Sequence, residues 1–215
     1  LKGIPGKQTV QRLLGGEWMP VNEEETIMPQ DGMDVRTTID IEIQEAAENA
    51  LRNQLSLSDV FEGATAIVIE VKTGAVRAIT NMKKMDNGEF DESFNYAISQ
   101  ATEPGSTFKL ATLVALIEDG YVNLETPVDA GNGRWKYSTK EFTDVTKGGY
   151  GLIDVRKAFE KSSNVAFAKL AVEYYANNEK KYVDRLHNMK IGEKFNLDIM
   201  GEGRSVIHSP GDAMW

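Results

Sequence analysis

The amino-acid sequence predicts an α+β fold in which helices pack against an antiparallel sheet. Three observations lead to this class. Residues 34–39 alternate in polarity ahead of an amphipathic helix, two β-rich segments are separated by residues 72–74 alone, and a strongly helical segment follows them. Strands joined by so short a turn run antiparallel, and amphipathic helices then cover a face of their sheet.

The composition indicates one sizeable core and excludes several classes of function. The chain has 215 residues, of which 41% are hydrophobic, and a formal net charge of -9. It shows no basic groove with aromatic platforms, so nucleic acid is not an expected partner. It has no cysteine, and His187 and His208 are too far apart in sequence for a zinc motif, so we expect no metal and no cofactor. Its apolar runs are too short to cross a bilayer.

Residues 1–33 are predicted to be a linker or the end of a non-catalytic N-terminal domain. Gly15-Gly16, Pro20 and Pro29 interrupt this segment, which has no sustained hydrophobic period. The sequence begins with Leu1 and has no signal-peptide pattern. We therefore expect it to be a piece of a longer protein.

The elements of a folded domain begin at residue 34. They are, in order, a strand at 34–39, a helix capped by Asp40 with an apolar stripe from Ile43 to Leu55, and strands at 65–71 and 75–80. Lys72-Thr73-Gly74 is the predicted hairpin turn between the two strands. A polar loop containing Asp86-Asn87-Gly88 then leads to the next helix.

The stretch around which the chain is organised is residues 103–109, with the sequence EPGSTFK. Pro104 and Gly105 are unfavourable inside a helix, so we expect the helix to begin at about Ser106 and to end at Gly120. Apolar residues on most of its faces predict a helix buried in a core.

Ser106 and Lys109 are three residues apart and are therefore neighbours on one face of this helix. A serine hydroxyl is a poor nucleophile until a neighbour takes its proton, and both burial and the positive helix end favour an uncharged lysine. Free N–H groups at the helix start would stabilise an oxyanion beside Ser106. Alternatively, Ser106 only caps the helix and Lys109 extends to solvent. Ser-x-x-Lys occurs by chance too often to decide between these readings.

A second candidate segment is Ser162-Ser163-Asn164, between a helix that Asp154 caps and a longer helix that ends near Tyr175. Residues 122–151, which precede it, are predicted to be loop. Either serine could simply cap the longer helix. In the functional reading, Ser162 relays a proton between Lys109 and a departing amine, and Asn164 holds the lysine or a substrate amide.

The other Ser-x-Asn match, Ser93-Phe94-Asn95, lies in a loop upstream of the nucleophile. Its place in the chain makes it the weaker candidate.

Ser106-x-x-Lys109 followed by Ser162-x-Asn164 resembles the first two signatures of the penicillin-recognising serine acyltransferases, which comprise penicillin-binding proteins and serine β-lactamases. Further segments resemble class B penicillin-binding proteins, especially division-type ones; they are residues 31–40, 103–109, 161–165 and 191–203. The resemblance covers residues 34–215. It implies the N-terminal part of a transpeptidase domain, in which a sheet flanked by helices adjoins a mostly helical subdomain.

The third signature of that family, Lys-Thr/Ser-Gly, follows Ser-x-Asn and lies on a strand. Lys72-Thr73-Gly74 matches its letters but precedes the nucleophile, and no such triplet follows Asn164. We therefore expect the fold to be incomplete at its C-terminal strands and this chain to be weakly active or inactive. We also expect the family's membrane anchor to be absent from it.

The resemblance implies a peptidoglycan D,D-transpeptidase that is anchored in the cytoplasmic membrane, faces the cell wall in the periplasm, and functions in wall synthesis or division. Its implied partners are stem peptides ending in D-Ala-D-Ala, β-lactam antibiotics and membrane-embedded wall-synthesis or division proteins. No cofactor is implied, because the serine itself carries the acyl group. The alternatives are a serine β-lactamase, for which Glu193 lies in a plausible region, and a non-catalytic β-lactam sensor or scaffold.

Overall fold

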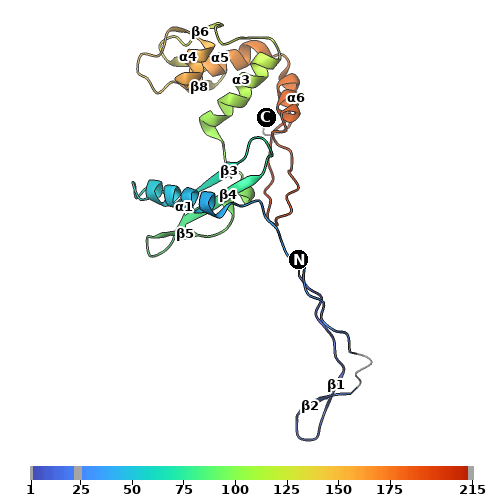
Figure 1. The fold of residues 1–215 in the computed structure, drawn as a ribbon. Helices are drawn as coiled ribbons and strands as arrows, with labels where there is room; N and C mark the ends of the chain where they lie inside the picture. Colours follow the sequence, from blue (N-terminus) through green and yellow to red (C-terminus); the bar gives the residue numbers. More distant parts are fainter. Residues whose placement is uncertain (1, 22–25, 213–215) are drawn as a thin grey trace. The chain divides into compact units, whose positions relative to one another are not determined.

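The computed structural model describes residues 2–21 and 26–212. The chain divides into two compact units, residues 1–97 and 98–215, each with its own strands and helices (Figure 1). The division into compact units does not test the predicted boundary between segments 1–33 and 34–215, so that boundary stays a prediction. Residues 1, 22–25 and 213–215 of these two segments lie outside the described part of the chain. Within the described residues, no helix is both long enough and apolar enough to cross a membrane.

The N-terminal segment of the first unit forms a two-stranded antiparallel ladder. Strand β1 (Val10–Arg12) pairs with β2 (Trp18–Pro20), and isolated bridges join Ile4 to Gln30 and Lys7 to Ile27. Nearly all of its described residues are exposed. A ladder with no buried face needs no alternation of polar and apolar residues, which explains why the sequence pattern did not reveal it.

The main sheet of the first unit has three antiparallel strands, β3 (Gly63–Ile69), β4 (Val76–Lys84) and β5 (Phe90–Glu92), in that order. The predicted turn at residues 72–74 is confirmed, with the left-handed φ of Gly74 at 72°. Residues 86–88 are the turn of a second hairpin rather than a loop leading to a helix. The sequence analysis missed β5 because three residues are too few to show a period.

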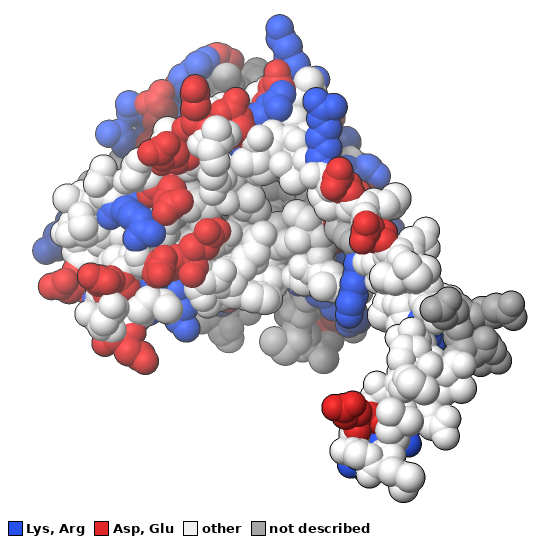
Figure 2. All heavy atoms as spheres, turned by 60° about the horizontal axis from the view of Figure 1, so that its bottom comes forward, with Lys and Arg blue, Asp and Glu red and all other residues white. Residues whose placement is uncertain are grey.

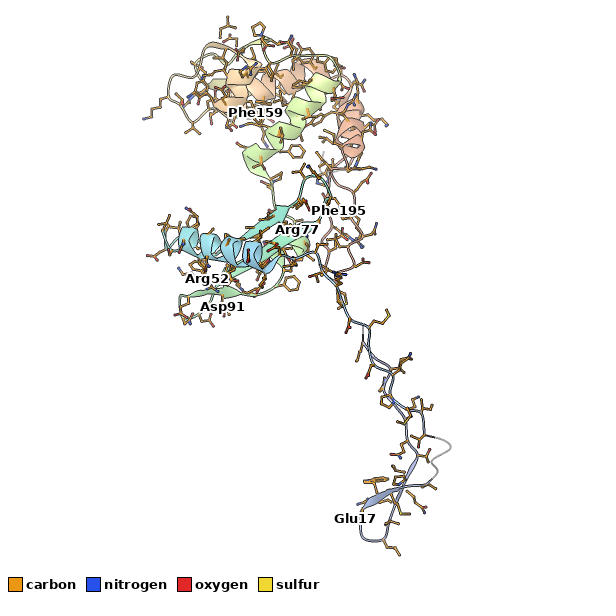
Figure 3. The ribbon with its side chains drawn as sticks, in the orientation of Figure 1. Glu17, Arg52, Arg77, Asp91, Phe159 and Phe195 are labelled. Atoms are coloured by element: carbon orange, nitrogen blue, oxygen red, sulfur yellow. The ribbon has the colours of Figure 1, made fainter. Side chains whose placement is uncertain are left out.

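Helix α1 (Ile41–Leu55) packs on β3 and β4, and its predicted cap is confirmed, since Asp40 Oδ1 accepts from Glu42 N at 3.0 Å. The Gln44 side chain donates to the Ile79 carbonyl of β4 at 3.0 Å and accepts from Ile79 N at 2.8 Å. Farther along the helix, Arg52 reaches Asp91 of β5 at 3.6 Å (Figure 3).

The strand predicted at residues 34–39 is wrong. Separate bonds rather than a ladder join this region to β4: the Thr38 hydroxyl donates to the Val76 carbonyl, Asp40 N donates to the Arg77 carbonyl, and Arg77 Nη1 donates to the Thr38 carbonyl. Without a continuous ladder, the alternating segment stays irregular.

The second unit combines four main helices with two pairs of short antiparallel strands. The helices are α3 (Lys109–Glu118), α4 (Val155–Glu160), α5 (Asn164–Tyr175) and α6 (Glu179–Asn188), and the strand pairs are β6 (Pro127–Asp129) with β9 (Leu152–Asp154) and β7 (Arg134–Tyr137) with β8 (Lys140–Thr143). The short helix α2 (Tyr96–Ser99) spans the junction of the two units. The antiparallel sheets and the helices together confirm the predicted α+β class.

Two predictions for the second unit are corrected. Residues 122–151 contain three strands rather than loop alone, each too short to show alternation. Helix α3 ends at Glu118, and Gly120, the predicted stop, follows its cap with a left-handed φ of 71°. The helix is not buried all round as predicted: its buried residues are Thr112, Leu113, Ala115 and Leu116, whereas Leu110 is 55% exposed. The buried side belongs to a core shared with α4, α5 and β6.

The C-terminal end of α3 is tied to α5 and α6 by a buried carboxylate. The Asp119 side chain is 1% exposed and accepts hydrogen bonds from Arg185 Nε at 3.0 Å and from the Tyr175 hydroxyl at 2.8 Å. Burial by itself would raise the pKa of Asp119, but the hydrogen bonds from Arg185 and Tyr175 outweigh burial and lower it. Asp119 is therefore held ionised inside the unit.

Charged side chains of both signs are interspersed on the face of the molecule seen in Figure 2. Some charged side chains of the described residues form exposed ion pairs, such as that between Arg156 and Glu125, at 2.8 Å. Pairs of this kind contribute little to stability because water screens both charges.

Candidate active site

The nucleophile candidate lies on a tight turn that leads directly into α3. Residues 105–108 form a 3₁₀ helix, and α3 begins at Lys109 without a break. Gly105 opens the turn with a left-handed φ of 57°. The predicted start at Ser106 is therefore helical, but of the 3₁₀ kind, in which residues i and i+3 lie directly above one another. This geometry places Lys109 Nζ 3.0 Å from Ser106 Oγ.

The other predicted site residues contact the same Lys109 amine. Lys109 Nζ donates to the Ser162 carbonyl at 2.7 Å, to Ser162 Oγ at 2.9 Å and to Asn164 Oδ1 at 2.6 Å. The structure thus brings together all four candidates, Ser106, Lys109, Ser162 and Asn164. Their proximity is confirmed, and their catalytic roles stay predictions.

The two adjacent serines have different positions. Ser163 caps α5, because its Oγ accepts from Ala166 N at 3.0 Å, and it is fully buried. Ser162 precedes the cap with a left-handed φ of 52° and is exposed. The capping alternative therefore holds for Ser163, which leaves the Ser162 hydroxyl available to Lys109.

The contacts of Lys109 are also compatible with a neutral amine that acts as a base. The Ser162 carbonyl and Asn164 Oδ1 can only accept, so each takes one N–H bond of the amine. A neutral amine then has its lone pair left for the two hydroxyls, Ser106 Oγ and Ser162 Oγ. Either hydroxyl can donate its proton to Nζ from this position.

Burial favours the neutral form of Lys109. Burial lowers the pKa of the half-buried Lys109 amine, and the nearby Asp144 carboxylate partly opposes this effect. The expectation from sequence that burial favours the uncharged lysine is confirmed in direction. The predicted oxyanion site at the helix start stays a prediction.

Sequence analysis missed the residues that hold Asn164 and its loop. Asn164 Nδ2 donates to the Thr143 carbonyl at 2.7 Å, and the next residue, Asp144, accepts from Ser163 Oγ and from Val165 N. Both residues lie at the end of β8, in the region predicted to be loop. Phe142 and Thr143, two residues that favour strands just before the aspartate, were the available signal.

The rival motifs have local contacts of their own. Ser93-Phe94-Asn95 belongs to the first unit, where Asn95 Oδ1 accepts from Asn81 Nδ2 at 3.1 Å. Lys72-Thr73-Gly74 is a hairpin turn of the same unit. Glu193, the residue considered for a β-lactamase, pairs with Lys190 at 3.0 Å. Within the described residues, no group of acidic and histidine side chains could hold a metal ion.

Comparisons with known proteins agree on one family. Residues 64–211 match the model described as the penicillin binding protein transpeptidase domain. Stage V sporulation protein D of Bacillus subtilis (strain 168) is 25% identical over 213 residues, which cover 96% of this chain and 32% of that protein. A probable peptidoglycan D,D-transpeptidase, PenA of Neisseria flavescens, is 26% identical over 215 residues, covering 97% of this chain and 52% of that protein.

A solved structure, that of Pseudomonas aeruginosa PBP2 in complex with WCK 5153, superposes with a TM-score of 0.67 at 25% identity. The match covers 86% of this chain and 43% of that one. The chain spans about one third to one half of the length of the curated relatives described above.

Proposed function

The chain belongs to the penicillin-binding protein transpeptidase domain family, and on this premise we propose that it carries the acylation site of a peptidoglycan D,D-transpeptidase, of class B and division type, that also binds penicillin covalently. The observation that carries the proposal is the convergence of Ser106, Ser162 and Asn164 on the Lys109 amine. The proposed nucleophile, relay and orienting amide are thereby each within hydrogen-bond distance of the proposed base.

In the proposed reaction, Ser106 Oγ attacks the carbonyl carbon of the penultimate D-alanine of a stem peptide while its proton passes to neutral Lys109 Nζ. The bond to the terminal D-alanine nitrogen then breaks. The proton reaches that nitrogen through Ser162 Oγ, which lies 2.9 Å from Lys109 Nζ, and D-alanine leaves. The amine of a second stem peptide attacks the ester, completing the cross-link and restoring the Ser106 hydroxyl.

Labelling with a fluorescent penicillin tests this proposal in the full-length protein. Wild-type protein is expected to retain the label, and Ser106→Ala to abolish it, because alanine has no hydroxyl with which to attack the penicillin carbonyl. Ser56→Ala is a matched control, because Ser56 directly follows α1 and its Oγ donates to the Asn53 carbonyl of that helix. Continued labelling of Ser106→Ala would refute the role of Ser106.

The fate of the label separates the alternatives. Rapid loss of the acyl group would indicate a β-lactamase. Stable acylation by a full-length protein that forms no cross-links would indicate a sensor or scaffold.

The third signature is part of the proposal. Residues 165–215 contain no Lys-Thr/Ser-Gly triplet, and residues 72–74 are a hairpin turn. A strand carrying that triplet would supply the remaining oxyanion donor and the groups that bind the substrate carboxylate. Residues 1–215 alone are therefore expected to label weakly or not at all, and efficient labelling would show that the strand is dispensable.

The proposed location follows from the substrate. Stem peptides are cross-linked outside the cytoplasmic membrane, so we place the domain in the periplasm on a membrane-anchored protein. Its proposed partners there are the stem peptides and membrane-embedded wall-synthesis or division proteins.

A further inference from the structure

The Ser162 turn needs external support. A non-glycine residue with a φ of 52° is less stable than one in the right-handed region, because its Cβ approaches the following carbonyl oxygen too closely. The turn must nevertheless be well defined, because two of its oxygens, the carbonyl and the hydroxyl of Ser162, both contact Lys109 Nζ. Its own backbone supplies two bonds, from Ser162 N to the Phe159 carbonyl and from Ser163 N to the Ala158 carbonyl.

The remaining support comes from one dipeptide at the end of β8. Both oxygens of the Asp144 carboxylate lie within reach of Ser163 Oγ, at 3.1 and 3.0 Å, and Oδ1 also accepts from Val165 N at 3.1 Å. The Thr143 carbonyl accepts from Asn164 Nδ2 at 2.7 Å, which turns Asn164 Oδ1 toward Lys109. Thr143 and Asp144 thus bind three consecutive residues that follow the strained position.

We propose that Asp144 is a positioning residue for acyl transfer, which holds the turn of residues 162–164 so that its oxygens converge on the Lys109 amine. The inference rests on the proposed function and adds to it a residue that does not touch the reacting atoms. A carboxylate suits this position because it offers two acceptor oxygens to the Ser163 hydroxyl and the Val165 N–H.

Asp144 also acts on Lys109 through its charge. Ser106, Ser162 and Asn164, which contact the amine, are uncharged, and the Asp144 carboxylate opposes the effect of burial on the pKa of Lys109. Removing this charge should therefore lower the pKa of Lys109 further. A merely structural role would change the stability of the protein and leave the pH dependence of acylation unchanged.

The test measures the rate constant of acylation by fluorescent penicillin from pH 5.5 to 10 in full-length wild type, Asp144→Asn and Asp154→Asn. Asp144→Asn is expected to lower the plateau rate by about 10- to 100-fold, the order expected for a misplaced catalytic group, and to move the midpoint of the profile to lower pH. Asp154→Asn is the matched control, because Asp154 caps α4 through Lys157 N at 2.7 Å and contacts no site residue. It should keep the wild-type midpoint and plateau.

A wild-type plateau and midpoint in Asp144→Asn would overturn the inference while leaving the proposed function intact. A wild type that takes no label would instead overturn the proposed function. In that case, NMR titration of ¹⁵N-labelled lysine still decides whether Asp144 acts on the amine, since Lys109 Nζ should titrate at lower pH in Asp144→Asn than in wild type. Identical titrations would count against it.

Discussion

Replacing Asn164 by aspartate places a negative charge beside the base with almost no change in shape. Asn164 Oδ1 lies 2.6 Å from Lys109 Nζ, so a carboxylate oxygen there forms an ion pair with the protonated amine. For an effective dielectric constant of about 40, chosen because Lys109 is half-buried and partly screened, the Coulomb energy at this distance is about 3 kcal/mol. Since about 1.4 kcal/mol corresponds to a factor of ten, the neutral amine becomes about 100-fold rarer at pH 7.

We therefore expect Asn164→Asp to be acylated by fluorescent penicillin about 100-fold more slowly than wild type at pH 7. Its rate should recover as the pH is raised, with a midpoint above that of wild type, because deprotonation of Lys109 is delayed rather than prevented. The aspartate also loses the donor to the Thr143 carbonyl, which lowers the plateau but does not move the midpoint.

Two further variants isolate the charge effect. Asn164→Ala removes the same hydrogen bonds without adding a charge, so its profile should not move to higher pH. Asn178→Asp makes the same substitution at the exposed cap of α6 and should leave acylation unchanged. A wild-type midpoint in Asn164→Asp, or identical profiles for the aspartate and alanine variants, would refute the assignment of Lys109 as the base.

The remaining predictions concern stability, measured as the free energy of unfolding by chemical denaturation. Asp119→Ala leaves the Tyr175 hydroxyl and the Arg185 guanidinium without their acceptor, so it should lower the free energy of unfolding by about 3 kcal/mol. The control Asp184→Ala removes an exposed ion pair with Lys180 and should lower it by less than about 1 kcal/mol. Because the pKa of Asp119 is lowered on folding, the loss of stability in Asp119→Ala should be complete above about pH 5 and shrink as the pH falls below 3.8, the ordinary pKa of the carboxyl. A loss that is independent of pH would contradict the ion pairing. Leu116→Ala, at a fully buried position, should lower the free energy of unfolding by about 2–5 kcal/mol, whereas Leu110→Ala, at a position that is 55% exposed, should lower it by less than about 1 kcal/mol. Equal losses would contradict the one-sided burial of α3.

Sequence reasoning succeeded where the determining interactions are local. The Asp40 and Asp154 caps, the hairpin turn at residues 72–74 and the end of α3 before Gly120 each depend on residues within one turn of the chain. The proximity of Ser106 and Lys109 belongs to the same class, because a spacing of three residues fixes it in any helical turn. Strands of three or four residues were missed because they are too short to show alternation.

The sequence by itself determined which residues could form the site, since Ser106-x-x-Lys109 and Ser162-x-Asn164 can be read from their letters and order. Only the tertiary structure decided that the two motifs meet, through contacts between residues 53 and 55 positions apart, and that Ser162 rather than Ser163 faces the amine. It alone placed Asp144 behind them, 19 residues before Ser163. Such contacts depend on how α3, α5 and β8 pack, and packing is set by the shape of the whole core rather than by the residues that it brings together.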